Sequence, residues 1–372
     1  MVKKVLLSDI HSKEAQMTEF AGFYMPLFYS SILEEHMAVR EKVGIFDVSH
    51  MGRALIEGVD AIKFVNYLTA NDVNRLVDGK SHYSLLLNED GGIIDDILVY
   101  RLTQSRILIV YNAGNREKDL RWITSHADGF NVSIEDISDR TVMIAIQGPF
   151  STKIVGKLYR EALDLKRFYI TYFSFKDIEG WISRTGYTGE DGFEIIALVN
   201  DTNSAINFWN DLKQDVVSMG GLPCGLGARD SLRLEAGYCL YGNDIDETTN
   251  PYEANLSWVV KMDQGDFIGK QALIELKDNI TRLRIGLVMN DRSIPRKGYL
   301  IYDCDEKSLL GQVSSGGFSP ILKKGIGMGY VNINYAVNGE EICIDVRGKT
   351  RNATVRNFPL YDADRYGFRR KQ

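Results

Sequence analysis

The sequence predicts an α+β protein built of two or more packed domains, the last of them all-β. The chain has 372 residues, and single hydrophobic cores stop growing at roughly 250–300 residues, so we expect it to divide into domains. Segments with helical periodicity alternate with short apolar strands through most of the chain. From Thr281 onward, short strands separated by turns replace this pattern, which indicates a small β-barrel or β-sandwich.

Composition and charge exclude several classes of protein. Hydrophobic residues make up 44% and charged residues 25% of the chain, which argues against disordered, collagen-like and coiled-coil proteins. The net charge of −6 gives no global attraction to nucleic acid or to an anionic membrane. No apolar run approaches the roughly 18 residues of a membrane span, and the N-terminal apolar stretch is too short for a signal peptide. We therefore expect a soluble, cytoplasmic protein with no nucleic-acid or membrane partner.

Periodicity and turn signals place the first elements. A helix is expected from Ser31 to Val43, because Ser31 and Glu34 have capping-box spacing and Gly44 is a natural stop. The segment IFDVSHMGRALIEG is expected to form a strand that is interrupted at Gly52, and a short helix that begins at Asp60 follows.

Residues 83–112 predict a three-stranded antiparallel meander, with the turn EDGG after its first strand. A helix near Glu117 to His126, the strand VMIAIQG and helices over 202–219 and 227–236 follow. Between them, WISRTGYTGEDGFEI has two strand-like ends across a glycine-containing loop. Beyond a boundary at 277–279, the expected strands are LRIGLVM, YLIYD, GQVSSGGFSP, IGMGYVNI, EEICIDVR and ATVRNF.

Cysteine and histidine spacing gives no metal signature. The chain has 4 cysteines and 5 histidines, all dispersed, with no C-x-x-C, H-x-x-x-H or H-E-x-x-H pattern. We therefore expect no zinc site, and we expect the cysteines to be small buried residues rather than a disulfide framework. The phosphate-binding loop and the nucleophile elbow of hydrolases are also missing.

The strand GGIIDDILVY carries two adjacent carboxylates. Because neighbouring strand residues point to opposite faces, Asp96 should share a face with Leu98 and Tyr100, while Asp95 lies on the other. A carboxylate in such an apolar strand must accept hydrogen bonds, pair with a cation or raise its pKa. Spacing alone leaves a structural and a functional role open.

Two further motifs are ambiguous on spacing alone. The glycines of RTGYTGEDGFE permit either a structural turn or close approach of a flat ligand, and Glu194 lies where the strand resumes. In GLGARDSLRLEAG, Arg229 and Arg233 share a helix face, as part of an ion-pair lattice or as an anion site. Aromatic residues that could wall a flat-ligand site are Tyr83, Tyr100, Tyr187, Tyr238 and Trp258.

The order of the motifs resembles the aminomethyltransferase (T-protein) family of the glycine cleavage system over nearly the full length. The matching segments are FAGFYMPLFYSSILEEHMAVREKVGIFDVSHMG, NEDGGIIDDILVY, AIQGP, SRTGYTGEDGFEI, GLGARDSLRLEAGYCLYGNDIDETTNPYEANLSWVVK and VSSGGFSP. The resemblance implies a three-domain cloverleaf around a central folate channel, with a C-terminal β-barrel. It implies domains at 1–52 plus 140–250, at 53–139 and at 281–372, with a connecting segment at 251–280.

The implied enzyme is a tetrahydrofolate-dependent aminomethyltransferase of one-carbon metabolism and glycine catabolism. It would transfer the methylene of the aminomethyl group on lipoyl H-protein to tetrahydrofolate, giving 5,10-methylenetetrahydrofolate, ammonia and dihydrolipoyl H-protein. Tetrahydrofolate would be the acceptor, with no metal, and the P- and L-proteins would be functional associates. The tail 365–372 carries three arginines and a lysine; we expect it to be solvated, with docking of an acidic H-protein as the alternative.

The resemblance also implies roles for individual residues. Asp96 matches the essential carboxylate near the folate nitrogens, Glu194 the glutamate that holds the pterin, and Arg229 a substrate-contacting arginine. Tyr366 matches the terminal tyrosine to within a residue. The further residues expected to line the folate channel are Met51, Tyr83, Tyr100, Val110, Asn112, Tyr187 and Trp258.

Two relatives of the same fold are alternatives. A folate-dependent demethylase would keep the pterin glutamate but differ at the donor site, and the intact LEAGYCLYGNDIDETTNP block favours the T-protein branch. A noncatalytic folate-binding relative would carry K-G-C-[YF]-x-G-Q-E, whereas Cys239 lies in GYCLYG.

Overall fold

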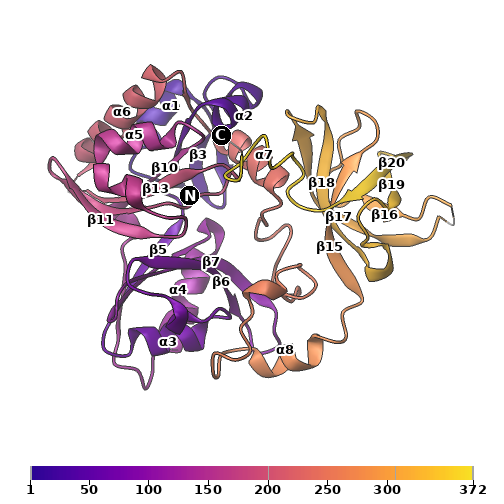
Figure 1. The fold of residues 1–372 in the computed structure, drawn as a ribbon, viewed down its shortest axis with the longest axis horizontal. Coiled ribbons are helices and arrows are strands. Elements are labelled where there is room, and N and C mark those ends of the chain that lie inside the picture. The colour runs from indigo at the N-terminus through magenta and orange to yellow at the C-terminus, as the bar shows by residue number, and fades with distance from the viewer. Residues whose placement is uncertain (1, 200, 306, 371–372) are drawn as a thin grey trace.

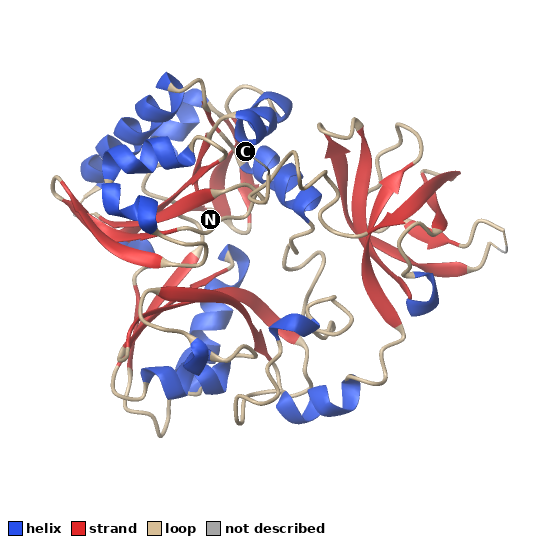
Figure 2. Cartoon of the chain, viewed as in Figure 1, coloured by secondary structure: helices blue, strands red, loops and turns tan. Residues whose placement is uncertain are grey.

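Three strand-rich lobes organise the chain in the computed structural model, and loops cross between them (Figures 1 and 2). The structure describes residues 2–199, 201–305 and 307–370. The outermost residues of the predicted first and last domains, 1 and 371–372, therefore lie outside the described residues. Figure 2 shows helices on the outer sides of two lobes, while the third lobe is almost entirely strand. No helix of the described part is long and apolar enough to cross a membrane.

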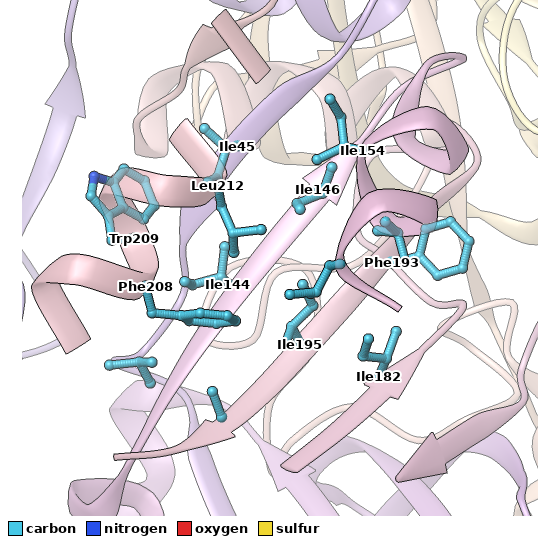
Figure 3. Packing of buried hydrophobic residues seen from close by; sticks show 14 of the residues in the cluster. Ile45, Ile144, Ile146, Ile154, Ile182, Phe193, Ile195, Phe208, Trp209 and Leu212 are labelled. Carbon is cyan, nitrogen blue, oxygen red and sulfur yellow. The ribbon is translucent and has the colours of Figure 1, made fainter. Parts of the chain in front are cut away.

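A six-stranded mixed sheet forms the first lobe. One face packs against α1 (Ser8–Glu14), α5 (Ser151–Leu158) and α6 (Thr202–Ser218), and Figure 3 shows Ile144, Ile195 and Trp209 in this apolar layer. Neighbouring strands are antiparallel, apart from the parallel pair at one edge. In spatial order the strands are β11 (Ile170–Phe175), β12 (Ile178–Ser183), β13 (Gly192–Leu198), β10 (Thr141–Gln147), β4 (Gly44–Asp47) and β14 (Leu222–Pro223).

A five-stranded antiparallel sheet forms the second lobe and contains the predicted meander. In spatial order its strands are β6 (Lys80–Leu87), β7 (Ile93–Thr103), β8 (Arg106–Tyr111), β5 (Gly52–Glu57) and β9 (Ser133–Asp136). Ile97 and Val99 of β7 pack beside residues of α3 (Ala61–Leu68) and α4 (Arg116–Ser125). Tyr100 packs toward the six-stranded sheet. The alternation predicted for this strand is confirmed.

The N-terminal segment folds over the junction of the sheets. Its small sheet contains β1 (Lys3–Lys4), β3 (Phe23–Phe28) and β2 (Gln16–Phe20). Helix α2 (Ile32–Glu41) then packs against α7 (Leu226–Ala236). The Ser31 hydroxyl accepts from the Glu34 N–H at 3.2 Å, as the capping spacing predicted. The helix ends earlier than expected because β4 begins at Gly44.

The third lobe is a closed six-stranded barrel, which confirms the all-β expectation for the end of the chain. It is reached through a long irregular segment and α8 (Lys270–Leu276). In order around the barrel the strands are β15 (Arg282–Met289), β18 (Lys324–Asn332), β17 (Leu309–Ser319), β16 (Leu300–Tyr302), β19 (Glu341–Val346) and β20 (Lys349–Arg356).

One expectation for the cysteines is wrong. Cys304 and Cys343 form a disulfide, with their Cα atoms 5.1 Å apart, whereas Cys224 and Cys239 are free and buried as expected. The pairing of β16 with β19 aligns Tyr302 with Cys343 and so brings Cys304 alongside. The two cysteines are 39 residues apart in sequence, so their spacing gave no sign of this pairing.

A buried polar network fixes α7 against the barrel. Arg233 of α7 contacts Asp244 at 2.6 Å, and Asp244 also accepts from the hydroxyls of Ser314 and Ser315 on β17. Two residues after Arg233, the Glu235 carboxylate accepts from Ser319 at 2.5 Å. Because both carboxylates are fully buried and fully paired, this network holds the barrel in a defined position beside the two sheets.

Candidate functional site

A cavity of about 1100 Å³ lies where the two sheets, α7, the barrel and the C-terminal segment meet. Its volume is slightly above the usual range for small-molecule sites, about 300–1,000 Å³. Ten of the eleven residues expected at the site line it: Met51, Tyr83, Asp96, Val110, Asn112, Tyr187, Glu194, Arg229, Trp258 and Tyr366. They lie between residues 51 and 258 and at residue 366, so the fold brings together side chains that are far apart in the sequence.

Tyr100 is the expected residue that does not line the cavity. It is fully buried on the face of β7 that packs toward the six-stranded sheet. Its hydroxyl lies 3.3 Å from the Thr185 hydroxyl, which in turn donates to Glu194 at 2.6 Å. Tyr100 therefore supports the cavity wall from behind. Thr185 is a supporting residue that our residue-by-residue reading missed, although it stands in the RTGYTGEDG motif.

The Asp96 carboxylate faces the cavity with a donor on each oxygen. The Tyr83 hydroxyl donates to Oδ2 at 3.1 Å, and the Asn112 amide donates to Oδ1 at 2.8 Å. Burial, followed by the negative charge of Asp95, raises the pKa of Asp96 from 3.8 to about 7. A carboxyl group with a pKa near neutrality can both take up and release a proton at working pH.

Asn112 connects the two carboxylates of β7. Its side-chain amide donates to Asp95 Oδ1 at 2.9 Å and to Asp96 Oδ1 at 2.8 Å. The two aspartates therefore point to opposite faces, as predicted, but share one donor at the end of the neighbouring strand β8. Strand alternation alone predicted that they would be independent, because it takes no account of a residue that follows the adjacent strand.

The Glu194 carboxylate enters the cavity from β13. Its side chain is buried, and Oε2 accepts from Thr185 at 2.6 Å, while no described residue donates to Oε1. Burial raises the pKa of Glu194, and the Thr185 hydrogen bond and the charge of Arg229 oppose that rise. This arrangement leaves a carboxylate oxygen available to a ligand with hydrogen-bond donors.

Arg229 and Arg233 lie one turn apart on α7 and have different environments. Arg233 is 2% exposed and makes an ion pair with Asp244. Arg229 lines the cavity, its guanidinium 4.6 Å from the centre of the Tyr187 ring, and no described carboxylate lies within 4.0 Å of it. Of the two interpretations left open by the sequence, the ion-pair lattice fits Arg233, and an anion-binding or electron-rich contact fits Arg229.

Aromatic side chains form two walls of the cavity. The rings of Tyr83 and Trp258 stack with centres 5.8 Å apart, and 58% of Trp258 is exposed. Tyr187 and Tyr238 lie with ring centres 5.8 Å apart, and the Tyr187 hydroxyl donates to the Cys239 carbonyl. Flat apolar walls with a few charged groups are typical of sites for planar heterocyclic ligands.

The C-terminal segment folds back over the cavity, so the expectation of a solvated tail is wrong for Gly367 and Arg370, although Arg365, Phe368 and Arg369 are exposed. The buried Glu190 carboxylate accepts from the Gly367 N–H at 2.8 Å and pairs with Arg370. Phe368 donates its N–H to Gly189 at 2.9 Å, and the Arg167 guanidinium lies 3.3 Å from the centre of its ring. Residues 371–372 of the predicted tail lie outside the described residues.

Four further residues line the cavity that the sequence analysis did not predict: Arg167, Gly367, Phe368 and Arg369. The positions of the three tail residues depend on the contact of the tail with Glu190, which pairs residues about 180 positions apart. Among the described residues, no three His, Cys, Asp or Glu side chains are grouped as a metal site.

Comparisons with known proteins agree across both parts of the fold. The GCVT N-terminal domain family matches residues 6–264, and the glycine cleavage T-protein C-terminal barrel domain family matches residues 282–362. An aminomethyltransferase of Thermotoga neapolitana is 45% identical over 352 residues, 93% of this chain and 94% of that protein. One of Chloroherpeton thalassium is 44% identical over 368 residues, 98% of this chain and 100% of that protein.

A solved structure is also similar over its whole length. The glycine cleavage system aminomethyltransferase T of Bartonella henselae superposes with a TM-score of 0.90 at 36% identity, covering 99% of this chain and 100% of that one. Both family matches and the full-length relatives agree with the resemblance read from the motifs. The chain therefore belongs to the glycine cleavage T-protein family of aminomethyltransferases.

Proposed function

We propose that this protein transfers the methylene of the aminomethyl group carried on lipoyl H-protein to tetrahydrofolate. The products are 5,10-methylenetetrahydrofolate, ammonia and dihydrolipoyl H-protein. The observation that carries the proposal is the convergence of Asp96 and Glu194 on one cavity, in a chain that belongs to the aminomethyltransferases. The cavity is large enough for a folate together with the end of an incoming carrier arm.

Glu194 and Arg229 bind and orient the folate in this proposal. A pterin edge offers an N–H and an NH₂ group side by side, and the free oxygen of Glu194 can accept from such an edge. Arg229, without a carboxylate partner, contributes positive charge to the same part of the cavity. The wall of Tyr83 and Trp258 limits the positions open to planar rings.

Asp96 carries the proposed chemistry. Transfer requires the two folate nitrogens to form bonds to the methylene carbon while its bonds to the amino nitrogen and to the lipoyl sulfur break. Each folate nitrogen loses a proton, and these protons leave with ammonia and with the dihydrolipoyl thiol. Departure of a leaving group after the first new bond has formed gives the attacking nitrogen cationic iminium character. A carboxylate held by Tyr83 and Asn112 can orient that nitrogen, accept or relay its proton and stabilise the cation. Its pKa of about 7 suits proton exchange near neutrality.

The partner in this proposal is lipoylated H-protein, with the P- and L-proteins as functional associates and the cytoplasm as the location. A carrier arm must reach Asp96 from outside the protein, and the exposed ring of Trp258 lies at the cavity beside Tyr83. The anchored C-terminal segment acts as a wall of the cavity in this account.

Ammonia release from aminomethyl-lipoyl H-protein, with and without tetrahydrofolate, tests the proposal. We expect release to be strongly folate-dependent and to match the methylenetetrahydrofolate formed, with Asp96→Asn as the control of low activity. Tetrahydrofolate binding without ammonia release contradicts the proposal. A screen of small methyl donors would then test the folate-dependent demethylase alternative.

A further inference from the structure

Behind Asp96, on the face of the sheet that meets the helices, lies a second pair of carboxyl groups. Asp95 of β7 and Asp119 in the first turn of α4 are both 0% exposed. Asn115, directly before α4, donates to Asp95 at 2.6 Å, so the first turn of α4 lies against this end of β7, and Asp119 interacts electrostatically with Asp95. Neither residue lines the cavity, and the proposed mechanism has not used Asp119.

The two members of this pair have very different hydrogen-bond partners. Asp95 accepts from the Asn112 N–H at 2.9 Å, from the Asn112 amide at 2.9 Å and from the Asn115 amide at 2.6 Å. Both oxygens of Asp119 are buried, and no donor among the described residues reaches either of them. Asp95 is therefore suited to be an anion, and Asp119 is not, because a buried carboxylate without donors is strongly disfavoured.

The charged groups around Asp119 act mainly in the same direction. Burial and then the negative charge of Asp95 raise the pKa of Asp119 to about 11, with Asp96 adding to the rise and Lys118 opposing it. The ammonium of Lys118 is directed away, to the Ile94 carbonyl, the Tyr241 hydroxyl and Glu247. Tyr111 and Tyr241 are the other titratable groups that interact with Asp119.

We propose that Asp119 is a protonated positioning residue, whose carboxylic O–H donates to Asp95 and so fixes Asp95, Asn112 and Asp96 in one hydrogen-bonded line. The inference rests on the proposed function only for its consequence, since the protonation itself is independent of the reaction. The donor holds the Asp95 anion in place, and Asp95 orients the Asn112 amide. That amide supplies one of the two hydrogen bonds to Asp96.

This hydrogen-bonded arrangement also accounts for part of the raised pKa of Asp96. An ionised Asp95 behind the strand contributes to the raised pKa of Asp96. Protonation of Asp119 leaves the Asp95–Asp119 pair with a single negative charge, which the amides of Asn112 and Asn115 satisfy. Asp119 therefore acts on the cavity through two residues without contacting the substrate.

Infrared spectroscopy of the whole protein tests the protonation directly. In the Asp96→Asn background at about pH 9, below the pKa of Asp119, we expect a carboxylic-acid carbonyl band. Aspartate labelled with carbon-13 at the side-chain carboxyl should shift this band, which separates it from Glu35 and Glu194. The band should disappear in Asp96→Asn/Asp119→Asn.

A missing band, or a band that the aspartate label does not shift, overturns the inference, including the case of an ionised Asp119 that holds a cation. A band that persists in Asp119→Asn overturns it as well. Because the labelled parent spectrum needs no change at Asp119, the test stands even if that variant fails to fold. The spectrum also does not depend on activity, so it separates failure of this inference from failure of the proposed function.

Kinetics then tests the positioning role. Asn at position 119 keeps a neutral donor toward Asp95, whereas Leu keeps the bulk and removes the donor. We expect Asp119→Leu to lower kcat about tenfold, as for the loss of one buried hydrogen bond, with unchanged tetrahydrofolate affinity. Asp119→Asn should recover most of that loss. Glu117→Gln, at an exposed position of the same helix, is the matched control; equal losses in the Asn and Leu variants contradict the role.

Discussion

Two carboxylates reach the same cavity from two different sheets, and the nearby charged residues have opposite signs. Asp96 on β7 has a donor on each oxygen and the negative charge of Asp95 behind it. Glu194 on β13 has one donor, an oxygen to which no described residue donates, and the positive charge of Arg229. The same functional group is therefore prepared for proton exchange in one sheet and for ligand recognition in the other.

Removal of the charge at Asp96 should have the largest effect. Asp96→Asn keeps the shape but loses the proton acceptor and the stabilisation of the cation, so we expect kcat to fall about 10²–10⁴-fold. Tetrahydrofolate binding, measured by calorimetry, should change less than about threefold. A variant with near wild-type turnover would remove Asp96 from the mechanism.

The two arginines of α7 sharpen the comparison on the Glu194 side. Arg233→Met leaves the buried Asp244 without its cation, so we expect about 3–5 kcal/mol of lost stability in denaturant unfolding. Arg229→Met breaks no ion pair of the described residues and should cost less than about 1 kcal/mol, while weakening folate binding. Similar stability losses in both variants would contradict the division between a structural and a binding arginine.

Glu194→Gln should weaken binding rather than chemistry. The substitution replaces a charged acceptor with a neutral amide, and a hydrogen bond to a charged group is worth about 1.5–3 kcal/mol. We therefore expect the dissociation constant for tetrahydrofolate to rise about tenfold or more, with kcat at saturating folate within about threefold of wild type. Calorimetry and initial rates check the two parts separately, and an unchanged dissociation constant refutes the assignment.

The raised pKa of Asp96 gives a pH dependence with a definite sign. Between about pH 4 and pH 7 the folded state binds more protons at this group than the unfolded state does, so ionisation of Asp96 costs stability as the pH rises. At about pH 8, the free energy of unfolding of Asp96→Asn should exceed that of wild type by about 1–2 kcal/mol, so the variant should unfold at a higher temperature. The difference should disappear near pH 4; an advantage that grows toward acid contradicts the sign.

Turnover should respond to the same group in the opposite direction. Because the ionised form acts in the proposed mechanism, kcat should rise with pH through about 7 in the wild type. The residual rate of Asp96→Asn should lack this limb. An identical pH profile in both proteins would assign the limb to another group.

The anchored C-terminal segment should give the smallest effect. Arg370→Ala removes one of two cations from Glu190, while Arg40 remains at 3.0 Å. We expect less than about 1 kcal/mol of lost stability and a modest rise in the Michaelis constants, because the segment lines the cavity without reaching Asp96. Lys349→Ala, at an exposed position of the barrel strand β20, is the control. A loss of turnover as large as that of Asp96→Asn would contradict the wall role.

Local rules predicted much of the fold. Alternation placed Asp96 and Tyr100 on one face of β7, and capping spacing placed the start of α2. Turn signals and strand spacing predicted a β-barrel or a β-sandwich at the end of the chain, and they gave neither the closure of the barrel nor its strand order. These features depend on residues within a few positions of one another, where periodicity carries information.

Features that depend on distant pairs were not predictable from local pattern. The disulfide of Cys304 with Cys343 follows from the pairing of β16 with β19, and the path of the tail follows from Glu190. The shared donor of Asp95 and Asp96 comes from Asn112, which the resemblance placed at the channel without indicating this bridge. The site was found through the whole order of motifs, because no single motif was specific.

One paired measurement tests the central contrast most directly. Equilibrium tetrahydrofolate binding and single-turnover ammonia release would be measured side by side for Asp96→Asn and Glu194→Gln, at saturating folate for the turnover. We expect retained binding with lost turnover for Asp96→Asn, and weakened binding with retained turnover for Glu194→Gln. The same pattern in both variants would contradict the assignment of chemistry to one sheet and recognition to the other.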